Sequence, residues 1–226
     1  MSASVQGWQR GSFGVDHTPP GLAAALQLLE GVAESRVFEP GKRIHTWGDR
    51  TGYWYRLHSG AAKRQGIGDS GNLQIVDFVF PGDWFGLSIR VLHEFATEII
   101  APHSVICRYP REQIHEALEG RAPLLLEVVD AAFRATTRLQ RHMRVLLRPS
   151  PQARLAGFLV EMRQRASDAA GNLALPMPLR DIANYLLLSD EEVSEALLQW
   201  VADEAIELLG DRHIRVLDAR ALAAFE

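Results

Sequence analysis

The sequence has a single cysteine, Cys107, among its 226 residues. One thiol cannot form a disulfide within the chain, and it cannot by itself supply a site that needs four thiolates. The sequence also lacks an apolar run of about 18 residues, the length that a membrane-spanning helix requires. Its first residues lack the basic and then apolar pattern of a signal peptide. We therefore expect a soluble, cytoplasmic protein that does not act at a membrane.

Positive charge is scarce in the C-terminal part of the chain. Residues 1–149 contain 17 Lys and Arg against 15 Asp and Glu, a net charge of +2, whereas residues 150–226 contain 7 against 13, a net charge of −6. With 47% hydrophobic and 23% charged residues, the chain has the composition of a globular protein. A nucleic-acid-binding surface normally carries an excess of Lys and Arg. The C-terminal part departs from that pattern.

The N-terminal part has the pattern of a β domain. Residues 1–20 are rich in Gly, Ser and Pro without sustained periodicity, and we interpret them as a flexible arm. A short amphipathic helix is predicted over residues 21–36. From Val37 to Tyr109, β-branched and aromatic runs alternate with turn sequences such as FPGDWFG, which is typical of a compact antiparallel barrel or sandwich. DSGN predicts a hairpin turn before the alternating strand LQIVDFVF.

A long helix without glycine or internal proline is predicted from Pro123 to Leu147. Seven of its residues repeat at alternating spacings of three and four, the pattern of a coiled-coil seam. We expect the same helix of a second subunit to pack parallel along this seam. The predicted dimer interface consists of Leu125, Val128, Ala132, Ala135, Leu139, His142 and Leu146.

The C-terminal part predicts a winged helix-turn-helix. RPSP ends the long helix because proline cannot continue it. A helix in QARLAGFLVEMRQRA, two short helices joined by a tight turn, a third helical stretch to Leu209, and a hairpin at Gly210 and Asp211 follow. The predicted fold class is α+β: an N-terminal antiparallel β-roll, a long dimerisation helix and a C-terminal winged helix. The predicted parts are a flexible arm at 1–20, an effector-type β-roll at 21–122, the dimerisation helix at 123–148 and the winged helix at 149–226.

This order of parts resembles the CRP/FNR superfamily of bacterial transcription regulators over about residues 22–222. The most specific sequences are YRLHSGAAKR, FVFPGDWFGL, RDIANYLLLSDEEVS and RHIRVLDARAL. PGDWFGL followed by HEFATEIIAPHSV is most similar to the FixK/FNR branch. The resemblance implies a jelly roll of the cyclic-nucleotide-binding type, a homodimer, and DNA binding through the winged helix.

Two ligands of the superfamily are not expected here. Its cyclic-nucleotide branch has Glu and an Arg-Ser pair where this sequence has Leu87, after Gly86, and Glu94 with Phe95. A carboxylate there would repel a cyclic phosphate, so cyclic AMP is not expected. Cys107 matches the barrel cysteine of the iron-sulfur branch, but the arm has no cysteine to complete a cluster. We interpret Cys107 as a small buried residue in a strand, with a redox-sensitive thiol as the alternative.

Five histidines fall in or beside the predicted β-roll: His45, His58, His93, His103 and His115. None forms a pair four residues apart, and solvated or locally bonded imidazoles are the commoner outcome. We therefore predict no metal and no cofactor, with a haem ligand at His93 or His58 as the alternative. No nucleophile and base stand in a recognised catalytic motif, so we do not expect an enzyme.

The second helix of the helix-turn-helix is acidic. Ser189 and Glu192 have the spacing of a capping box, and acids in a first turn suit the positive end of the helix dipole. The FixK/FNR branch resembles E-x-x-S-R here, so Glu191 and Ser194 match while Glu195 replaces an arginine. Arginine binds guanine O6 and N7, whereas glutamate repels phosphates. Glu191 is able to accept a hydrogen bond from cytosine N4.

The turn before this helix has Leu187 where the family usually has glycine, which predicts a distorted turn if positive φ is required. Few cations remain to contact phosphates. The candidate DNA-binding residues are Arg180, Ser189, Glu191, Glu192, Ser194, Glu195, Arg212 and Arg215. The favoured hypothesis is a dimeric CRP/FNR-type regulator with weakened or altered DNA contacts. The alternative is a regulator-derived protein that no longer binds DNA and acts through a protein partner.

Overall fold

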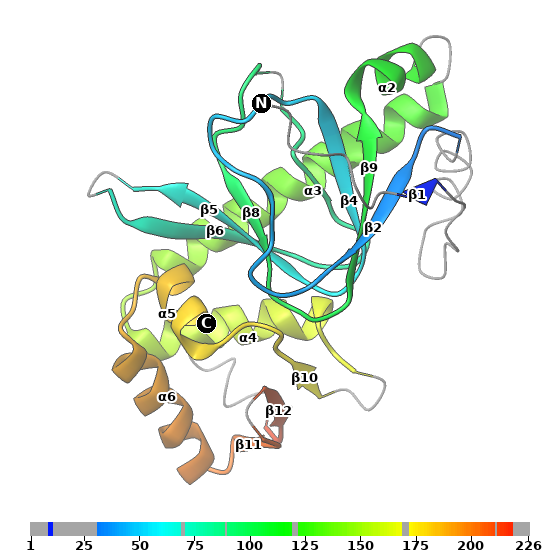
Figure 1. The fold of residues 1–226 in the computed structure, drawn as a ribbon. Helices are drawn as coiled ribbons and strands as arrows, with labels where there is room; N and C mark the ends of the chain where they lie inside the picture. The colour runs from blue at the N-terminus through cyan, green and yellow to red at the C-terminus, as the bar shows by residue number, and fades with distance from the viewer. Residues whose placement is uncertain are drawn as a thin grey trace. The chain divides into compact units, whose positions relative to one another are not determined.

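The chain forms two compact units that are described separately. The computed structural model describes residues 9–10, 31–68, 71–88, 90–118, 122–168, 172–210 and 212–218. The first unit contains Met1–Ile67 and Phe78–Thr136, and the second contains Gly68–Asp77 and Thr137–Glu226. The order of strands and helices confirms the predicted α+β fold (Figure 1).

Two antiparallel sheets build the β-roll. The larger has the order β1-β2-β9-β4-β7 and the smaller the order β3-β8-β5-β6 (Figure 1). The strands are β1 (Gln9–Arg10), β2 (Glu34–Phe38), β3 (Arg43–His45), β4 (Tyr53–Ser59), β5 (Ala62–Ile67), β6 (Leu73–Val79), β7 (Trp84–Phe85), β8 (Ala96–Ile99) and β9 (Ser104–Pro110). Asp69 and Ser70 of the predicted DSGN turn lie outside the described residues, but β5 and β6 are neighbours, Gly68 N donates to the Asn72 carbonyl at 2.9 Å, and Gly71 has a φ of 77°.

Alternation along β4 divides the apolar residues of this unit between two clusters. Tyr55 and Leu57 belong to a cluster that draws residues from both sheets. Trp54 points to the other face, where it packs with Cys107 and with Ile114 of helix α2 (Arg111–Leu118). Successive side chains of a strand point to opposite faces. Strand β4 therefore contributes side chains both to the cluster between the two sheets and to the cluster that packs against α2. The sequence analysis did not predict α2 as a separate helix.

The N-terminal segment differs from its prediction where it is described. Gln9 and Arg10 of the predicted arm pair with β2 as strand β1. Most of the helix predicted over residues 21–36 lies outside the described residues, but its last residues form β2 instead. That strand pairs with β9 over five residues, and Arg108 Nε donates to Glu34 Oε2 at 2.8 Å. The ladder and this ion pair outweigh the helical propensity of the short segment.

The second unit contains the remaining helices and a small sheet in the order β10-β12-β11. Its helices are the C-terminal part of α3 (Ala122–Leu146), then α4 (Pro151–Arg165), α5 (Leu179–Leu186) and α6 (Asp190–Ala202). Its strands are β10 (Leu173–Ala174), β11 (Ile206–Leu208) and β12 (His213–Val216). The predicted long helix, the helix-turn-helix of α5 and α6, and the wing formed by β11 and β12 are confirmed. Ser150 caps α4 by accepting a hydrogen bond from Ala153 N at 3.1 Å.

The third helical stretch predicted to Leu209 is wrong. Helix α6 ends at Ala202, and Glu204 adopts the left-handed conformation with a φ of 54°. Ile206 then enters β11, where it is buried and pairs with Val216 of β12. The local sequence favours a helix, but strand pairing and burial of Ile206 decide the outcome. Within the described parts of the chain, no helix is long and apolar enough to cross a membrane.

Candidate nucleic-acid interface

The turn between α5 and α6 forms with leucine at its left-handed position. Leu187 has φ 55° and ψ 47°, and its N–H donates to the carbonyl of Asn184 at 3.3 Å. The next N–H, of Leu188, donates to the carbonyl of Ala183 at 2.9 Å. Positive φ is therefore required at Leu187, as the sequence analysis considered. The turn keeps its hydrogen bonds, so the strain resides in the leucine backbone rather than in a distorted turn.

Replacing Leu187 with glycine is expected to raise the free energy of unfolding by about 1 kcal/mol, because glycine adopts positive φ without a Cβ clash. The leucine side chain is 56% exposed, so little apolar burial is lost. The matched control is Leu198→Gly, at a 63% exposed position inside α6. There glycine is expected to destabilise by about 1 kcal/mol. Urea unfolding measures both changes, and destabilisation by Leu187→Gly would contradict the explanation.

Three of the predicted DNA-binding residues cap or brace α6. Ser189 N donates to Glu192 Oε2 at 2.8 Å, and Glu192 N donates to Ser189 Oγ at 3.1 Å. This is the predicted capping box, and it satisfies two backbone N–H groups at the start of the helix. Ser194 Oγ donates to the Asp190 carbonyl at 2.8 Å. These polar groups already have partners in the protein.

The exposed face of α6 is acidic and apolar. Glu191, Glu195 and Leu198 are exposed and stand four and three residues apart, so they share one face of the helix. The opposite face is buried and consists of Val193, Ala196, Leu197 and Trp200. The residues of α6 that extend into solvent therefore carry no positive charge.

The candidate cations differ in how strongly their charge is neutralised. Arg180 is exposed, with Nε 3.8 Å from an oxygen of Asp181. Arg212 Nη1 donates to the neutral Pro176 carbonyl at 3.0 Å. Arg215 forms an ion pair with Glu207 at 2.8 Å and donates to Asn172 Oδ1 at 3.2 Å. Arg215 is therefore largely neutralised by the wing itself.

Comparison with known proteins places these features in a family. Residues 35–121 match a cyclic nucleotide-binding domain, and residues 153–225 match a Crp-like helix-turn-helix domain. The transcriptional activatory protein AadR of Rhodopseudomonas palustris is 32% identical over 176 residues, covering 75% of this chain and 73% of AadR. This chain belongs to the CRP/FNR family of transcription regulators.

The same comparison places this CRP/FNR protein in the FixK branch. The nitrogen fixation regulation protein FixK of Bradyrhizobium diazoefficiens is 29% identical over 190 residues, covering 83% of this chain and 80% of FixK. The structure of FixK2 from Bradyrhizobium japonicum has a TM-score of 0.80 at 29% identity, covering 86% of this chain and 98% of that chain. The family consists of transcription regulators rather than enzymes, and its members bind DNA and are typically dimers.

Two residues of this CRP/FNR protein support the helix-turn-helix and were missed by the sequence analysis. Arg154 of α4 donates from Nη1 to the carbonyls of Leu186 and Leu187, both at 3.4 Å, beside the left-handed turn. Asn184 of α5 accepts from Ile75 N at 2.7 Å and donates to the Leu73 carbonyl at 3.0 Å. Both contacts join segments far apart in sequence, so no local pattern signals them.

The residues of the predicted seam on α3 differ in exposure within the single chain. Leu125 is 50% and Leu139 53% exposed, and both remain available to a second subunit. Val128 instead packs against the Trp54 cluster, and His142 is 6% exposed. Ala132 is exposed, whereas Ala135 and Leu146 are half-buried. The exposed apolar face of α3 is formed by Leu125, Leu126, Val129, Ala132, Phe133, Leu139 and Met143.

His142 packs inside the second unit. Its ring stacks on Tyr185 with centroids 3.8 Å apart, and its Nδ1 has no hydrogen bond among the described residues. Burial lowers the pKa of His142 to about 4, because the protonated ring loses hydration. The folded state then binds fewer protons than the unfolded state, so stability falls as pH decreases from about 6.5 toward 4.

Replacing His142 with phenylalanine is expected to keep the ring stacked on Tyr185 while removing this titration. At pH 7 the variant should be at least as stable as the wild type, since an unpaired buried nitrogen is removed. Between pH 7 and 5 the wild type should lose roughly 2 kcal/mol more stability than the variant. Urea unfolding at both pH values measures this difference. Parallel losses in the two proteins would contradict the assignment.

The interior of the β-roll next to the PGDWFG turn is filled by stacked rings. His45 and His93 stack with centroids 3.8 Å apart, and Tyr55 stacks on Phe85 at 5.2 Å. Gly86 has a φ of 70°, and a Cβ there would lie 2.8 Å from Tyr55 Cδ2, so glycine is required. Burial lowers the pKa of His45 to about 3. These two histidines therefore act as neutral packing rings.

His103 and Cys107, which the sequence places in or beside the β-roll, both lie in the first unit. No group of three His, Cys, Asp or Glu residues that suits a metal occurs among the residues searched, which are those described. His103 Nδ1 lies 2.9 Å from Glu39 Oε1. Cys107 is buried in β9, and burial raises the pKa of its thiol to about 11. The thiol is therefore protonated at neutral pH, which favours the structural interpretation over redox sensing.

Proposed function

We propose that this protein is a dimeric transcription regulator that binds DNA through its winged helix with weakened or altered contacts. The observation that carries the proposal is the exposed face of α6, where Glu191, Glu195 and Leu198 extend into solvent and Glu195 stands in place of the arginine that the family resemblance implies. Carboxylates in the major groove face a dense row of phosphates, and their repulsion reduces affinity for any sequence.

The surrounding cations offset this repulsion only in part. Arg180 and Arg212 are exposed and form no ion pair shorter than 3.8 Å within the described part of the chain, whereas Arg215 is paired with Glu207 at 2.8 Å. Two available cations per subunit would give few counterion-releasing contacts with the backbone. Glu191 remains able to accept a hydrogen bond from cytosine N4. Altered base preference is therefore part of the proposal.

The proposed dimer interface is the exposed apolar face of α3. Leu125, Leu139 and Phe133 are 50%, 53% and 66% exposed in the single chain. Such side chains along one helix favour burial against a second helix with the same pattern. A dimer presents two recognition helices, as reading of a two-fold symmetric site requires.

Neither cyclic AMP nor an iron-sulfur cluster belongs to the proposed mechanism. Glu94 occupies the position where the cyclic-nucleotide branch has its phosphate-binding arginine. Its Oε1 lies 3.4 Å from Arg90 Nη1. The guanidinium of Arg64 lies over the ring of Phe95, with Arg64 Cζ 4.9 Å from the ring centroid. Cys107 is one buried thiol, and the sequence contains no other cysteine.

The alternative function is binding to a protein partner in place of DNA. Leu187 and Leu198 are 56% and 63% exposed beside the acids of α6, and exposed leucines suit a protein interface better than a DNA groove. An interaction protein of this kind would keep the dimer helix and lose duplex binding.

In vitro selection from a library of random duplexes separates the two functions. The regulator is expected to enrich a sequence with two-fold symmetry, because two identical subunits read equivalent half-sites. The symmetric site should be lost when selection is repeated with Arg180→Gln and Arg212→Gln combined. Failure of the wild type to enrich any sequence at low salt would favour the protein partner.

A further inference from the structure

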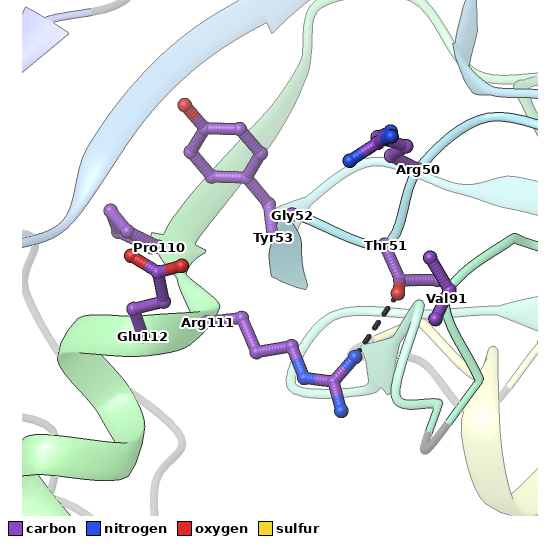
Figure 2. Close-up of a pocket in the computed structure, with 8 residues that line it drawn as sticks. All are labelled: Arg50, Thr51, Gly52, Tyr53, Val91, Pro110, Arg111 and Glu112. Carbon is purple, nitrogen blue, oxygen red and sulfur yellow. Dashed lines mark hydrogen bonds between the residues drawn. The ribbon is translucent and has the colours of Figure 1, made fainter.

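A cavity of about 560 Å³ opens in the first unit where three segments meet. Arg50, Thr51, Gly52 and Tyr53 approach along the start of β4, Val91 belongs to the connection between β7 and β8, and Pro110, Arg111 and Glu112 form the junction of β9 with α2. Figure 2 shows these side chains around the opening. Glu94 and Phe95, where the family resemblance places the cyclic phosphate, do not line it.

Backbone and hydroxyl hydrogen bonds fix the walls of this cavity. Thr51 N donates to the Val91 carbonyl at 2.9 Å, and Arg111 N donates to the Gly52 carbonyl at 3.0 Å. The Thr51 hydroxyl donates to the Arg90 carbonyl at 2.6 Å. These bonds connect the three segments directly. A ligand would therefore enter a largely formed site, which reduces the ordering cost of binding.

The two arginines give the cavity an excess of positive charge. Arg111 Nη1 donates to Thr51 Oγ1 at 3.1 Å and to the Arg90 carbonyl at 3.3 Å, both neutral acceptors (Figure 2). Arg50 is exposed, and no side-chain ion pair is formed by it within the described part of the chain. Glu112 carries the one carboxylate among the eight residues that line the cavity in Figure 2. One carboxylate against two guanidinium groups leaves positive charge available to a ligand.

The roles of the two arginines differ. Two hydrogen bonds hold the Arg111 guanidinium in one orientation while its other N–H groups remain available. Arg50 is exposed and able to adjust to the ligand. One guanidinium held in place and one able to move suit the binding of a carboxylate or phosphate group, because such a group accepts several charge-assisted hydrogen bonds. Tyr53, Val91 and Pro110 add apolar wall for a small organic body.

We propose that this cavity binds a small organic anion whose carboxylate or phosphate group is held by Arg111 and Arg50. Glu112 sets the preference by repelling ligands with further negative charge close to α2. Binding at this site is independent of DNA, so it adds an input to the regulator that the helix-turn-helix does not provide.

Isothermal titration calorimetry with pyrophosphate and with malonate, at constant ionic strength and without DNA, tests this site. At least one probe is expected to bind with a Kd of about 1 mM or tighter. The stronger probe identifies phosphate or carboxylate as the preferred group. Absence of heat with both probes up to roughly tenfold above that concentration would overturn the proposal.

Variants connect the binding to the cavity. Arg50→Gln and Arg111→Gln should each weaken the stronger probe about tenfold, and Glu112→Gln should strengthen it a few-fold. Arg36→Gln is the control, because Arg36 is an exposed arginine over Phe38 outside the cavity. Among the described residues, the wall is held by the backbone of Arg50 and not by its side chain, so Arg50→Gln keeps the test valid if Arg111→Gln unfolds. If Arg36→Gln weakened binding of the probe as much as the cavity variants do, the effect would come from net charge alone. That result would contradict binding at this cavity.

Discussion

Replacing Glu195 with arginine is expected to strengthen binding to duplex DNA by about tenfold or more at low salt. The wild-type carboxylate is exposed on α6, between Glu191 and Leu198. In the proposed complex it would repel the phosphates on either side of a groove. An arginine would add a phosphate or guanine partner and change the charge by two units per subunit. Fluorescence anisotropy with a labelled duplex measures the change.

Salt dependence distinguishes this mechanism from a general change in stability. One new phosphate contact in each subunit should steepen the plot of log K against log salt by about 2. The gain should therefore shrink as salt increases. Glu116→Arg is the matched control, since Glu116 is an exposed acid on α2. An equal gain in that control would assign the effect to net charge rather than to the recognition helix.

Replacing Leu139 with glutamate is expected to dissociate the dimer. Leu139 is 53% exposed on the apolar face of α3, so the substitution disturbs the single subunit little. In the dimer two carboxylates would face a desolvated seam, which costs about 3 kcal/mol and weakens association by roughly 150-fold. Sedimentation velocity at micromolar concentration should show the chain mass of 25.2 kDa for the variant and twice that mass for the wild type.

Thr137→Glu is the control for the dimer, because Thr137 is exposed on α3 but is not one of the apolar residues of that face. It is expected to leave association unchanged. A wild type that sediments as a monomer would remove the dimer from the proposal. Dissociation by both variants would instead indicate that added charge, rather than the position of Leu139, is responsible.

The sequence predicts those parts of the fold that depend on local pattern. The helix after Pro123 and the α5–α6 pair are visible because apolar spacing, proline and a capping box act within a few residues. The strand at Ile206 was predicted as helix because its pairing with Val216 lies outside any local window. In the same way, the partners of Arg154 and Asn184 are tens of residues away in sequence.

The candidate site was predictable in its residue types but not in their pairing. Glu191 and Glu195 follow from the sequence, and the structure adds that both are exposed. The ion pair between Arg215 and Glu207 joins strands β12 and β11, so it depends on the pairing of these strands and is not visible in the sequence. The burial of Val128 and His142 within the single chain was not predicted, because spacing alone does not show which side of an amphipathic helix its own subunit covers. His142 reveals that side only through its contact with Tyr185.

We propose that the recognition helix of this CRP/FNR protein makes weakened contacts with DNA. The test is binding of the wild-type protein to a random-sequence duplex over a range of salt concentrations. With Arg180 and Arg212 as the available cations among the described residues of the winged helix, four in the dimer, the slope of log K against log salt should be no steeper than about −4, with a Kd in the micromolar range or weaker near physiological salt. A slope steeper than about −6 with nanomolar affinity under the same conditions would contradict the claim.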